Sequence, residues 1–389
     1  MAMKIKEADA FENVYSTMVE KGFDGMAEAM QIMLNQGMQI ERERHLKAGS
    51  YERTEERNGH ANGFKPKNVK TRIGALDLRI PQVRDSSFYP EAMEKGLRSE
   101  RAFAISLAEM YVQGVSTRKV SKIMEEMCGV GVSSTQVSNA TKALDDEFEN
   151  WRNREIGEIT YLFLDARYEK IRMDGHVVSA ALFTAIGITA EGKRVILGAS
   201  VSYSENEVHW RTFLESLVTR GMHGLKLIIS DAHGGLKAAR VAVFPTCPWQ
   251  RCQFHLQQNA QAFVPSKDMK TSVANDIRYI FNAPNLEEAK RMLTIIADKY
   301  KSTASKLSDW LLDNVPETFA VFNFPEQNRK KIRTSNLIER LNKTIKARTR
   351  VVGIFPNEAS CLRLATAILI EENEEWMLEK KYIDFSEQG

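Results

Sequence analysis

The spacing of apolar and polar residues changes several times along the chain, and each change predicts a different kind of structure. Residues 8–48 carry apolar side chains at roughly helical spacing, so we expect them to form helix. A methionine-rich stripe runs through this region and consists of Phe23, Met26, Met30, Met33, Leu34 and Met38. Such a stripe is typical of a core or a dimer interface, with a ligand site as the alternative. Residues 49–66 are polar and contain glycine, which predicts a loop.

Residues 68–84 switch to a period of two, which is the period of a strand. Apolar residues alternate with basic or acidic ones on both sides of Gly74-Ala75, and this pattern predicts a hairpin with one apolar and one basic face. The basic face is either a solvated surface or a surface that docks on DNA or on a second protomer. Lys70 and Arg72 are the candidate DNA contacts on it.

Residues 97–150 predict a cluster of short helices. The first spans 101–113 and ends at Gly114, the second starts at Ser116-Thr117, and the third starts at Ser133-Ser134 after a break at 129–132. Short helices joined by a glycine turn are typical of a helix-turn-helix, with an ordinary three-helix bundle as the alternative. The polar side chains of the third helix suit phosphate or base contacts, and the candidates are Ser134, Gln136 and Lys142.

From residue 156 the pattern becomes that of an α/β core. The predicted order is strands 159–165, 176–188 and 193–203, helix 206–220, strand 225–231, helix 233–243 and a short strand near 246–251. Three antiparallel strands followed by helix, strand, helix and strand is a ribonuclease-H-like order. It puts the first strand at the centre of the sheet and the fourth strand beside it. Residues 257–332 then read as an α-helical insertion, because they are too long and too periodic for a loop.

Three carboxylates stand out against these elements. Asp165 and Asp231 each close a short apolar run, and Glu339 lies in a strongly basic helix. Two acids at strand ends and one on a helix is how a ribonuclease-H-like core holds two divalent metals, and such metals promote cutting and joining of phosphodiesters. Magnesium, or manganese, prefers these oxygen ligands. The alternatives are an ion pair between Asp165 and Arg167, and a Glu339 that balances its basic neighbours.

Charge is unevenly distributed, although the net charge is only +3. Residues 329–350 contain nine lysines and arginines and one acid, which favours a polyanionic partner at that surface. The candidate DNA contacts in this region are Arg333, Arg340, Lys343, Lys346, Arg348 and Arg350. With 43% hydrophobic and 27% charged residues, the composition is that of an ordinary globular protein.

Two further features each allow two interpretations. Cys252 and His255 form a Cys-x-x-His pair after the last strand, but zinc would need two more ligands, and Cys247 and His233 are irregularly spaced. Trp310 shares an apolar helical face with its neighbours in the insertion, which predicts a core position. The alternative for Trp310 is a platform on which a displaced DNA base stacks. No arrangement of Ser, Tyr or Cys favours a covalent DNA intermediate.

The remaining sequence features concern the cellular setting. Four unevenly spaced cysteines do not predict a disulfide framework, so we expect a reducing cytoplasm. The first residues lack the apolar segment of a signal peptide, and no apolar run approaches the ~20 residues of a membrane span. We therefore expect a cytoplasmic protein without a membrane partner.

Four motifs together resemble those of the bacterial mutator-type insertion-sequence transposases. They are Leu164-Asp165-Ala166-Arg167-Tyr168, Ser230-Asp231-Ala232-His233-Gly234-Gly235-Leu236, the run from Trp249 to His255, and the run from Arg333 to Asn342. The resemblance extends over about residues 50–370 and includes Phe355-Pro356-Asn357. It implies a DDE transposase whose metal ligands are Asp165, Asp231 and Glu339, with a helical insertion before the glutamate. It also implies terminal inverted repeats as substrate, target DNA as a second partner, and dimers in the working complex. The resemblance further implies a bacterial protein associated with the nucleoid.

The sequence therefore predicts a multidomain α+β protein. Its N-terminal part would be a helical and helix-turn-helix DNA-binding region with a basic β-hairpin, followed by a ribonuclease-H-like α/β catalytic core interrupted by an α-helical insertion. The predicted domains are residues 1–60, a candidate dimerisation region, and residues 64–90, 97–150, 156–256, 257–332 and 333–389. The predicted function is metal-dependent cleavage of transposon ends followed by strand transfer. The alternatives are a nuclease that only hydrolyses, and a DNA-binding repressor derived from a transposase.

Overall fold

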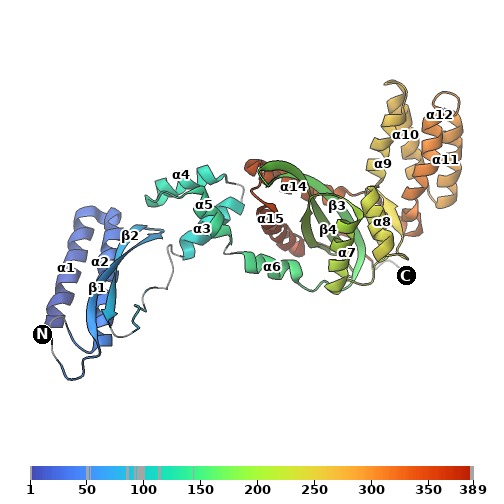
Figure 1. The fold of residues 1–389 in the computed structure, drawn as a ribbon. Helices are drawn as coiled ribbons and strands as arrows, with labels where there is room; N and C mark the ends of the chain where they lie inside the picture. Colours follow the sequence, from blue (N-terminus) through green and yellow to red (C-terminus); the bar gives the residue numbers. More distant parts are fainter. Residues whose placement is uncertain are drawn as a thin grey trace. The chain divides into compact units, whose positions relative to one another are not determined.

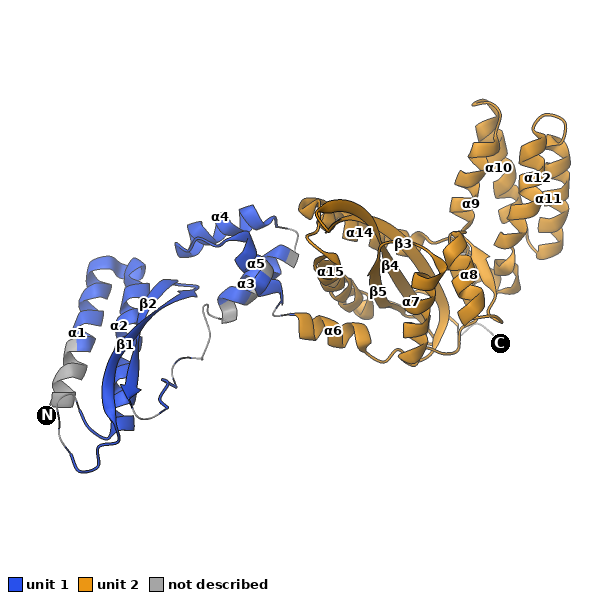
Figure 2. Ribbon diagram, viewed as in Figure 1, with its two compact units in different colours: residues 1–144 blue, residues 145–389 orange. Residues whose placement is uncertain are grey.

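The structure is a computed structural model that describes residues 2–49, 52, 54–84, 87–91, 93, 101–112, 115–142 and 144–385. The chain forms two compact units, residues 1–144 and residues 145–389, which Figure 2 shows in different colours. Both units combine helices with a β-sheet, so the chain is a multidomain α+β protein (Figure 1). Within the described residues, no helix is both long and apolar enough to cross a membrane.

The first unit begins with two helices where the sequence predicts one helical region over residues 8–48. Helix α1 spans Ala2–Lys21 and helix α2 spans Met26–Leu46, with a 3-10 turn over Gly22–Gly25 between them. The break falls at Gly22, whose φ of 57° is a left-handed conformation that glycine adopts readily. Only part of the methionine stripe is core, because Met38 is fully buried whereas Phe23 is 85% exposed.

The predicted hairpin is confirmed. Strand β1 spans His60–Thr71 and pairs antiparallel with β2, Gly74–Arg84. Its apolar face packs on α2 in a cluster formed by Met38, Val69, Leu76, Leu78, Ile80 and Met93. Strand β1 starts eight residues before the predicted position, in the region predicted as loop. Its first seven residues are exposed on both faces, so they lack the alternation that would have marked them as a strand.

Three short helices follow at the predicted positions. They are α3, Arg101–Val112, α4, Thr117–Cys128, and α5, Ser134–Lys142. The expected caps are present, because Ser116 Oγ accepts a hydrogen bond from the Lys119 N–H and Ser133 Oγ accepts one from the Gln136 N–H. The three helices share one core, which includes Phe103, Leu107, Val120, Met124 and Val137. The predicted end of the first helix at Gly114 lies outside the described residues.

A five-stranded sheet forms the centre of the second unit, with the order β5-β4-β3-β6-β7. Strands β3, β4 and β5 are antiparallel, and β6 and β7 run parallel to β3. Their bounds are Ile159–Met173, His176–Thr189, Arg194–Ser202, Leu227–Ser230 and Trp249–Arg251 for β3 to β7. The first strand lies at the centre with the fourth beside it, as the sequence predicts.

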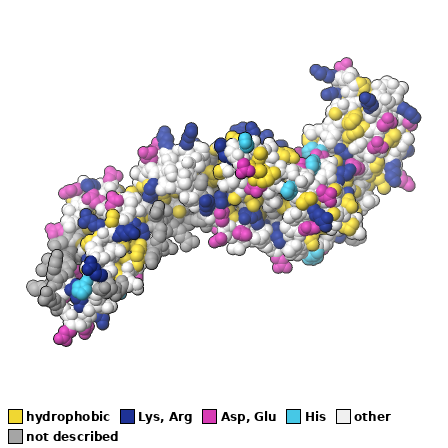
Figure 3. Space-filling view, viewed as in Figure 1, with side chains coloured by type: hydrophobic (Ala, Val, Ile, Leu, Met, Phe, Trp, Pro, Cys, Tyr) yellow, Lys and Arg dark blue, Asp and Glu magenta, His cyan; other side chains and the backbone are white. Residues whose placement is uncertain are grey.

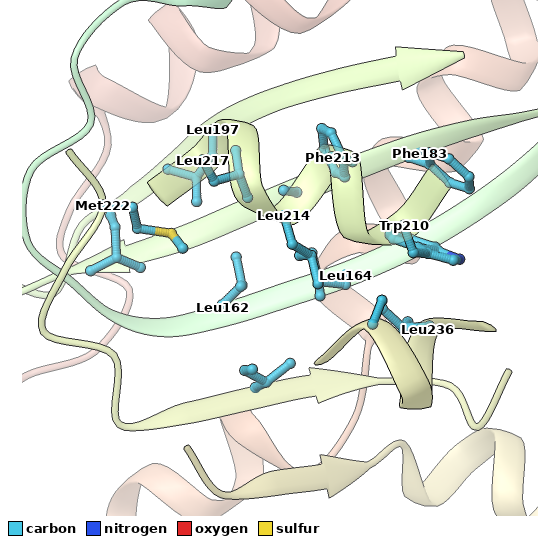
Figure 4. Packing of buried hydrophobic residues seen from close by; sticks show 14 of the residues in the cluster. Leu162, Leu164, Phe183, Leu197, Trp210, Phe213, Leu214, Leu217, Met222 and Leu236 are labelled. Atoms are coloured by element: carbon cyan, nitrogen blue, oxygen red, sulfur yellow. The ribbon is translucent and has the colours of Figure 1, made fainter. Parts of the chain in front are cut away.

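Two helices cover one face of this sheet. They are α7, Glu207–Thr219, and α8, Gly234–Val243. Trp210, Phe213, Leu214 and Leu217 recur at helical spacing on α7 and pack against Leu162 and Leu164 of β3, as Figure 4 shows. Because side chains alternate along a strand, the odd-numbered residues of β3 point to the opposite face.

Two further helices contact the sheet. Helix α14, Asn336–Val352, packs against β3, and helix α15, Glu358–Leu378, packs mainly against β5. Between these elements Phe355 bridges to Ile171 at the edge of β3, and Asn357 caps α15 by accepting a hydrogen bond from the Ser360 N–H. These contacts give structural roles to the Phe355-Pro356-Asn357 motif.

The insertion is helical, as predicted. Its elements are α9, Gln253–Ala260, α10, Met269–Phe281, α11, Leu286–Tyr300, α12, Ser305–Asn314, and α13, Glu326–Ile332. Helices α9 to α12 stand together beyond the sheet in Figure 1. The buried Gln250 of β7 anchors the far end of the insertion, since its Nε2 donates to Thr318 O and its Oε1 accepts from the Val321 N–H.

The division into two units is coarser than the predicted set of domains. Helix α6, Asp145–Asn153, belongs to the second unit, whereas the predicted helix-turn-helix domain extends to residue 150. The reason is a bidentate ion pair in which Arg363 of α15 holds both carboxylate oxygens of Asp145, at 2.5 and 2.7 Å. No local pattern in residues 145–150 signals a partner so far along the chain.

Candidate active site

Strand β3 presents a row of polar side chains to helix α14. Asp165, Arg167 and Glu169 are spaced by two residues and therefore share the face opposite the α7 packing. Asp165 Oδ2 accepts a hydrogen bond of 2.6 Å from Asn342 Nδ2, and its Oδ1 accepts one of 2.9 Å from the Ala166 N–H. Both oxygens of Asp165 are therefore held in place.

Arg167 does not neutralise Asp165, although the sequence offers it as the alternative partner. Its Nε lies 2.8 Å from Glu169 Oε1, and its Nη1 donates to the backbone oxygen of Asn342 at 2.6 Å. Glu169 also accepts a hydrogen bond from Thr349 Oγ1. These contacts fix α14 on the strand and leave Asp165 without a cationic partner on its own strand.

Asp231 directly follows β6, whereas Asp165 lies inside β3, which continues to Met173 in its pairing with β4 and does not end at residue 165 as the sequence predicts. Phe163 and Ile229 are paired in the parallel register of β3 and β6, and each aspartate comes two residues after its member of that pair. Asp231 Oδ1 accepts a hydrogen bond of 2.6 Å from the Ala232 N–H. Parallel pairing thus brings together two acids that are far apart in sequence.

Glu339 lies in the first turn of α14. Its Oε1 accepts a hydrogen bond of 3.0 Å from Ser335 Oγ and lies 3.7 Å from His255 Nε2. The helix that carries Glu339 is amphipathic, with Leu337, Ile338, Leu341 and Ile345 buried beneath it. Docking of that apolar stripe on the sheet brings Glu339 close enough to Asp165 for its charge to affect the pKa of Asp165.

Cys252 and His255 join the same cluster. Cys252 follows β7 and begins α9, and its Sγ accepts hydrogen bonds from Ser335 N and Oγ at 3.3 and 3.1 Å. The Ser335 hydroxyl has one proton, so it donates to Cys252 or to Glu339 at any moment. Ligand atoms of Cys252, His255 and Glu339 all lie within 4.8 Å of one another.

The cluster falls short of a four-ligand zinc site within the described residues. Of the two additional residues considered from the sequence, His233 pairs with Glu205 at 3.3 Å and Cys247 contacts the backbone oxygen of Leu225. A structural zinc ion takes four protein ligands. Cys252 and His255 therefore lie beside Glu339 without completing a structural zinc site among the described residues.

The charges of the cluster are coupled. Burial raises the pKa of Asp165 to about 6; His255 and the Ala166 N–H oppose this rise, and the charges of Asp231 and Glu339 add to it. Interaction with the Cys252 thiol raises the pKa of His255 to about 9, against burial and with help from Asp231 and Glu339. Burial alone would raise the pKa of Cys252, but hydrogen bonds with His255 and Ser335 outweigh it and lower that pKa.

Ser335 and Asn342 are absent from the site residues predicted from the sequence. Both are neutral, and their importance lies in contacts made across the fold. Asn342 is four residues from Ile338 and three from Glu339, so the helical period alone puts it on the acid's side of α14. That spacing is the signal that could have identified it. For Ser335, the signal is its position as the residue that starts the glutamate helix.

The basic residues predicted near the site differ in their surroundings. Arg340, Lys343, Lys346 and Arg350 are exposed on α14. Arg348 is partly buried and forms an ion pair of 2.5 Å with Glu371, and Arg333 donates to Asn282. On the face shown in Figure 3, basic side chains are interspersed with acidic ones, in line with the small net charge.

Trp310 is partly buried in the insertion. Its ring stacks on Phe263 with centroids 5.1 Å apart, and Arg251 lies over it at 5.8 Å. Leu307, Leu311 and Val315, which share its helical face, are fully buried. This packing supports a core role for Trp310 rather than the role of a stacking platform.

The residues of the first unit that the sequence predicts as DNA contacts also differ in their surroundings. Lys70 Nζ donates to Gly131 O at 2.5 Å and to Gln136 Oε1 at 3.1 Å, so these two candidates link the hairpin to α5. Ser134, Lys142 and Arg72 have exposed side chains. The structure thus gives Lys70 and Gln136 a role in joining two parts of the unit.

The chain is similar to known proteins over almost its whole length. The model of the family described as "Transposase, Mutator family" matches residues 2–379. The chain is 50% identical over 388 residues to the transposase for insertion sequence element IS406 of Burkholderia multivorans, with 99% of this chain and 100% of that protein covered. It is 40% identical to the transposase for ISRM5 of Rhizobium meliloti, over 94% of this chain and 92% of that one.

A third relative is the transposase for IS256 in transposon Tn4001 of Staphylococcus aureus, which is 39% identical over 91% of each chain. The matched regions include both compact units and all three acids. The chain belongs to the Mutator family of transposases.

Proposed function

We propose that this protein is a DDE transposase that cleaves the ends of its own insertion sequence and joins them to target DNA. The observation that carries the proposal is the convergence of Asp165 from inside β3, Asp231 from the end of the adjacent strand β6 and Glu339 from a helix into one electrostatically coupled cluster. The strand order of the second unit supports a ribonuclease-H-like core. Membership in a transposase family supports the reaction class.

The three acids fit a site for divalent metal. Carboxylate oxygens are the ligands that Mg²⁺ and Mn²⁺ prefer, and Asp165 carries the raised pKa of a buried acid beside other acids. Bound cations would offset the repulsion between the carboxylates of Asp165, Asp231 and Glu339. Two such ions held by Asp165, Asp231 and Glu339 would supply electrophilic stabilisation of the attacking and leaving oxygens of a phosphodiester.

The protein's own residues position these ligands. The Ala166 N–H and Asn342 orient the carboxylate of Asp165, while Ser335 and His255 lie against that of Glu339. Lys343, Lys346 and Arg350 would neutralise phosphates beside the site. In the first step water attacks the phosphodiester at the element end, and the freed 3′-hydroxyl then attacks a target strand in line.

Recognition of the terminal inverted repeats would fall to the first unit. Helices α3 to α5 have the order and caps of a helix-turn-helix, with Ser134 and Lys142 exposed on the last helix. Arg72 at the tip of the hairpin would contact phosphate. The exposed Phe23 and neighbouring methionines of α2 support an interface between two protomers, as expected of a working dimer.

The experiment that tests this function uses a pre-cleaved element end, a supercoiled target and Mg²⁺. A transposase joins the 3′-hydroxyl of that end to the target. A nuclease that only hydrolyses cuts an uncleaved end but yields no joined product. A repressor derived from a transposase binds the end and gives neither product, so the three candidates yield three different gels.

A further inference from the structure

Helix α9 has two faces with different chemistry. One face carries Cys252, His255 and the buried Leu256 towards the acid cluster and the insertion core. The other face lines a groove of about 380 Å³ shared with α10. The residues of this groove are Phe254, Gln257, Gln258, Gln261, Lys270, Thr271, Ala274, Asn275 and Arg278. We call it the α9–α10 groove.

The composition of the α9–α10 groove suits a nucleic-acid strand. Its lining includes two cations and no acid, and four carboxamides that can both donate and accept hydrogen bonds at base edges. Phe254 is 43% exposed although it is a large aromatic residue. Cations that follow a backbone together with an aromatic ring on which bases stack are the two elements of a single-strand binding site.

Asp276, the acidic residue next to Asn275 of the groove, points towards α11 and away from the groove. Asp276 of α10 accepts hydrogen bonds from Lys299 Nζ at 2.6 Å and from the Tyr300 hydroxyl at 2.5 Å, both on α11. Gln257 of α9 donates to Ala274 O of α10 and so joins the two walls of the groove, whereas Arg278 donates to Asn275 within α10. An anion in the groove would therefore meet Lys270 and Arg278 without a facing carboxylate from these helices.

Phe254 of the groove is the neighbour of His255, which contacts the acid cluster. The Phe254 ring lies next to that of His255, with centroids 5.6 Å apart, and His255 Nε2 is 3.7 Å from Glu339 Oε1. A strand whose scissile phosphate is at the acids would have its next nucleotides within reach of Phe254. Trp310, the aromatic candidate from the sequence, is already stacked on Phe263.

We propose that the α9–α10 groove binds unpaired nucleotides of the cleaved DNA end, with a base stacked on Phe254 and phosphates on Lys270 and Arg278. This inference rests on the proposed function and extends it, because it assigns the strand next to the scissile phosphate to a defined surface of the insertion. The carboxamides of the groove would contact base edges without demanding one sequence.

The test compares binding of two element-end DNAs in EDTA, one fully duplex and one with a short single-stranded overhang at the cleavage position. Phe254→Ala should weaken binding to the overhang DNA by about tenfold and leave duplex binding within about twofold. Phe254→Tyr keeps an aromatic ring and should restore binding. Tyr279→Ala, an exposed aromatic on α10 outside the groove lining, is the matched control and should bind both DNAs as the wild type does.

A second arm tests the cations and the stacked base. The double variant Lys270→Gln and Arg278→Gln should lower the salt dependence of overhang binding, whereas Lys290→Gln on α11 should not. A 2-aminopurine in the overhang should be quenched by the wild type and by Phe254→Tyr but not by Phe254→Ala. Equal losses on both DNAs, or no loss of overhang binding with an unchanged melting temperature, would overturn the proposal.

Binding in EDTA involves no chemistry, so it is independent of strand transfer by the wild type. If the wild type fails to transfer strands but Phe254→Ala still weakens overhang binding selectively, the proposed reaction is refuted and the binding role of the groove stands. If the wild type transfers strands normally but Phe254→Ala binds overhang and duplex DNA as the wild type does, the binding role of the groove is refuted and the proposed reaction stands.

Discussion

Asn342 of α14 donates a 2.6 Å hydrogen bond to Asp165 of β3, 177 positions away in the chain. The same residue accepts a hydrogen bond through its backbone oxygen from Arg167. One residue thus orients a candidate metal ligand and docks the helix that carries another, Glu339. The two acids are therefore positioned by a shared contact.

The first prediction concerns that contact. Asn342→Ala should weaken the response of end cleavage to Mg²⁺ by about 10- to 100-fold, because residues that orient a metal ligand contribute to metal affinity on that scale. The measurement is cleavage rate as a function of Mg²⁺ concentration. Asn259→Ala, an exposed asparagine on α9, is the control. An unchanged Mg²⁺ dependence for Asn342→Ala would remove it from the site.

The second prediction concerns phosphate contacts. Replacing Lys343, Lys346 or Arg350 with glutamine should each lower the salt slope of DNA binding by about one unit, because each would release one bound counterion. Arg348→Gln should lower it less, since Arg348 is already paired with Glu371. The measurement is DNA affinity between low and moderate salt. Equal slopes for all four variants and the wild type would assign these side chains to a solvated face.

The third prediction concerns Trp310. Trp310→Ala should lower the free energy of unfolding by about 3 kcal/mol, because it removes a large ring stacked on Phe263 and covered by Arg251. Denaturant unfolding measures the change. Activity per folded molecule should remain close to that of the wild type. Normal stability combined with slow end cleavage would instead restore the base-stacking role.

The fourth prediction concerns pH. The pKa of Asp165 is raised from 3.8 to about 6 in the folded protein, so folding favours its protonated form. Its contribution to stability is fully present below pH 3.8 and is lost as the pH rises through about 6. Metal needs the ionised carboxylate, so the Mg²⁺ affinity should rise over the same interval.

Melting temperatures in EDTA between pH 4 and pH 7 test this prediction. Asp165→Asn should remove part of the loss that the wild type shows over that interval, and Mg²⁺ should reduce the loss in the wild type only. The pKa of His255 is raised to about 9, so its contribution has the same sign but is lost only at higher pH. An identical pH profile for the variant and the wild type would contradict the assignment to Asp165.

Much of the second unit could be predicted from local patterns. Leu162 and Leu164 alternate on β3 and the apolar residues of α7 recur at helical spacing, so the elements and their inner faces follow from period alone. The order of those elements then places Asp165 beside Asp231. These predictions succeed because the signals lie within a few residues of the features they predict.

The remaining features depend on contacts between distant segments. Nothing near Asp145 indicates its ion pair with Arg363, and nothing near Cys252 indicates that its thiol meets Ser335. The break at Gly22 was concealed by continuous helical spacing on both sides. Lys70 looked like an exposed phosphate contact, but its ammonium group bonds to Gly131 and Gln136. In each case the partner lies outside the window in which periodicity is visible.

We propose that Asp165, Asp231 and Glu339 form one metal site for strand transfer. The most direct measurement is cleavage and joining of the element's own ends by Asp165→Asn, Asp231→Asn and Glu339→Gln, alongside DNA binding by the same proteins. Each substitution removes a charge but little surface, so each should abolish both reactions and leave end binding largely intact. Strand transfer near the wild-type rate by any one of the three variants would contradict the account for that residue.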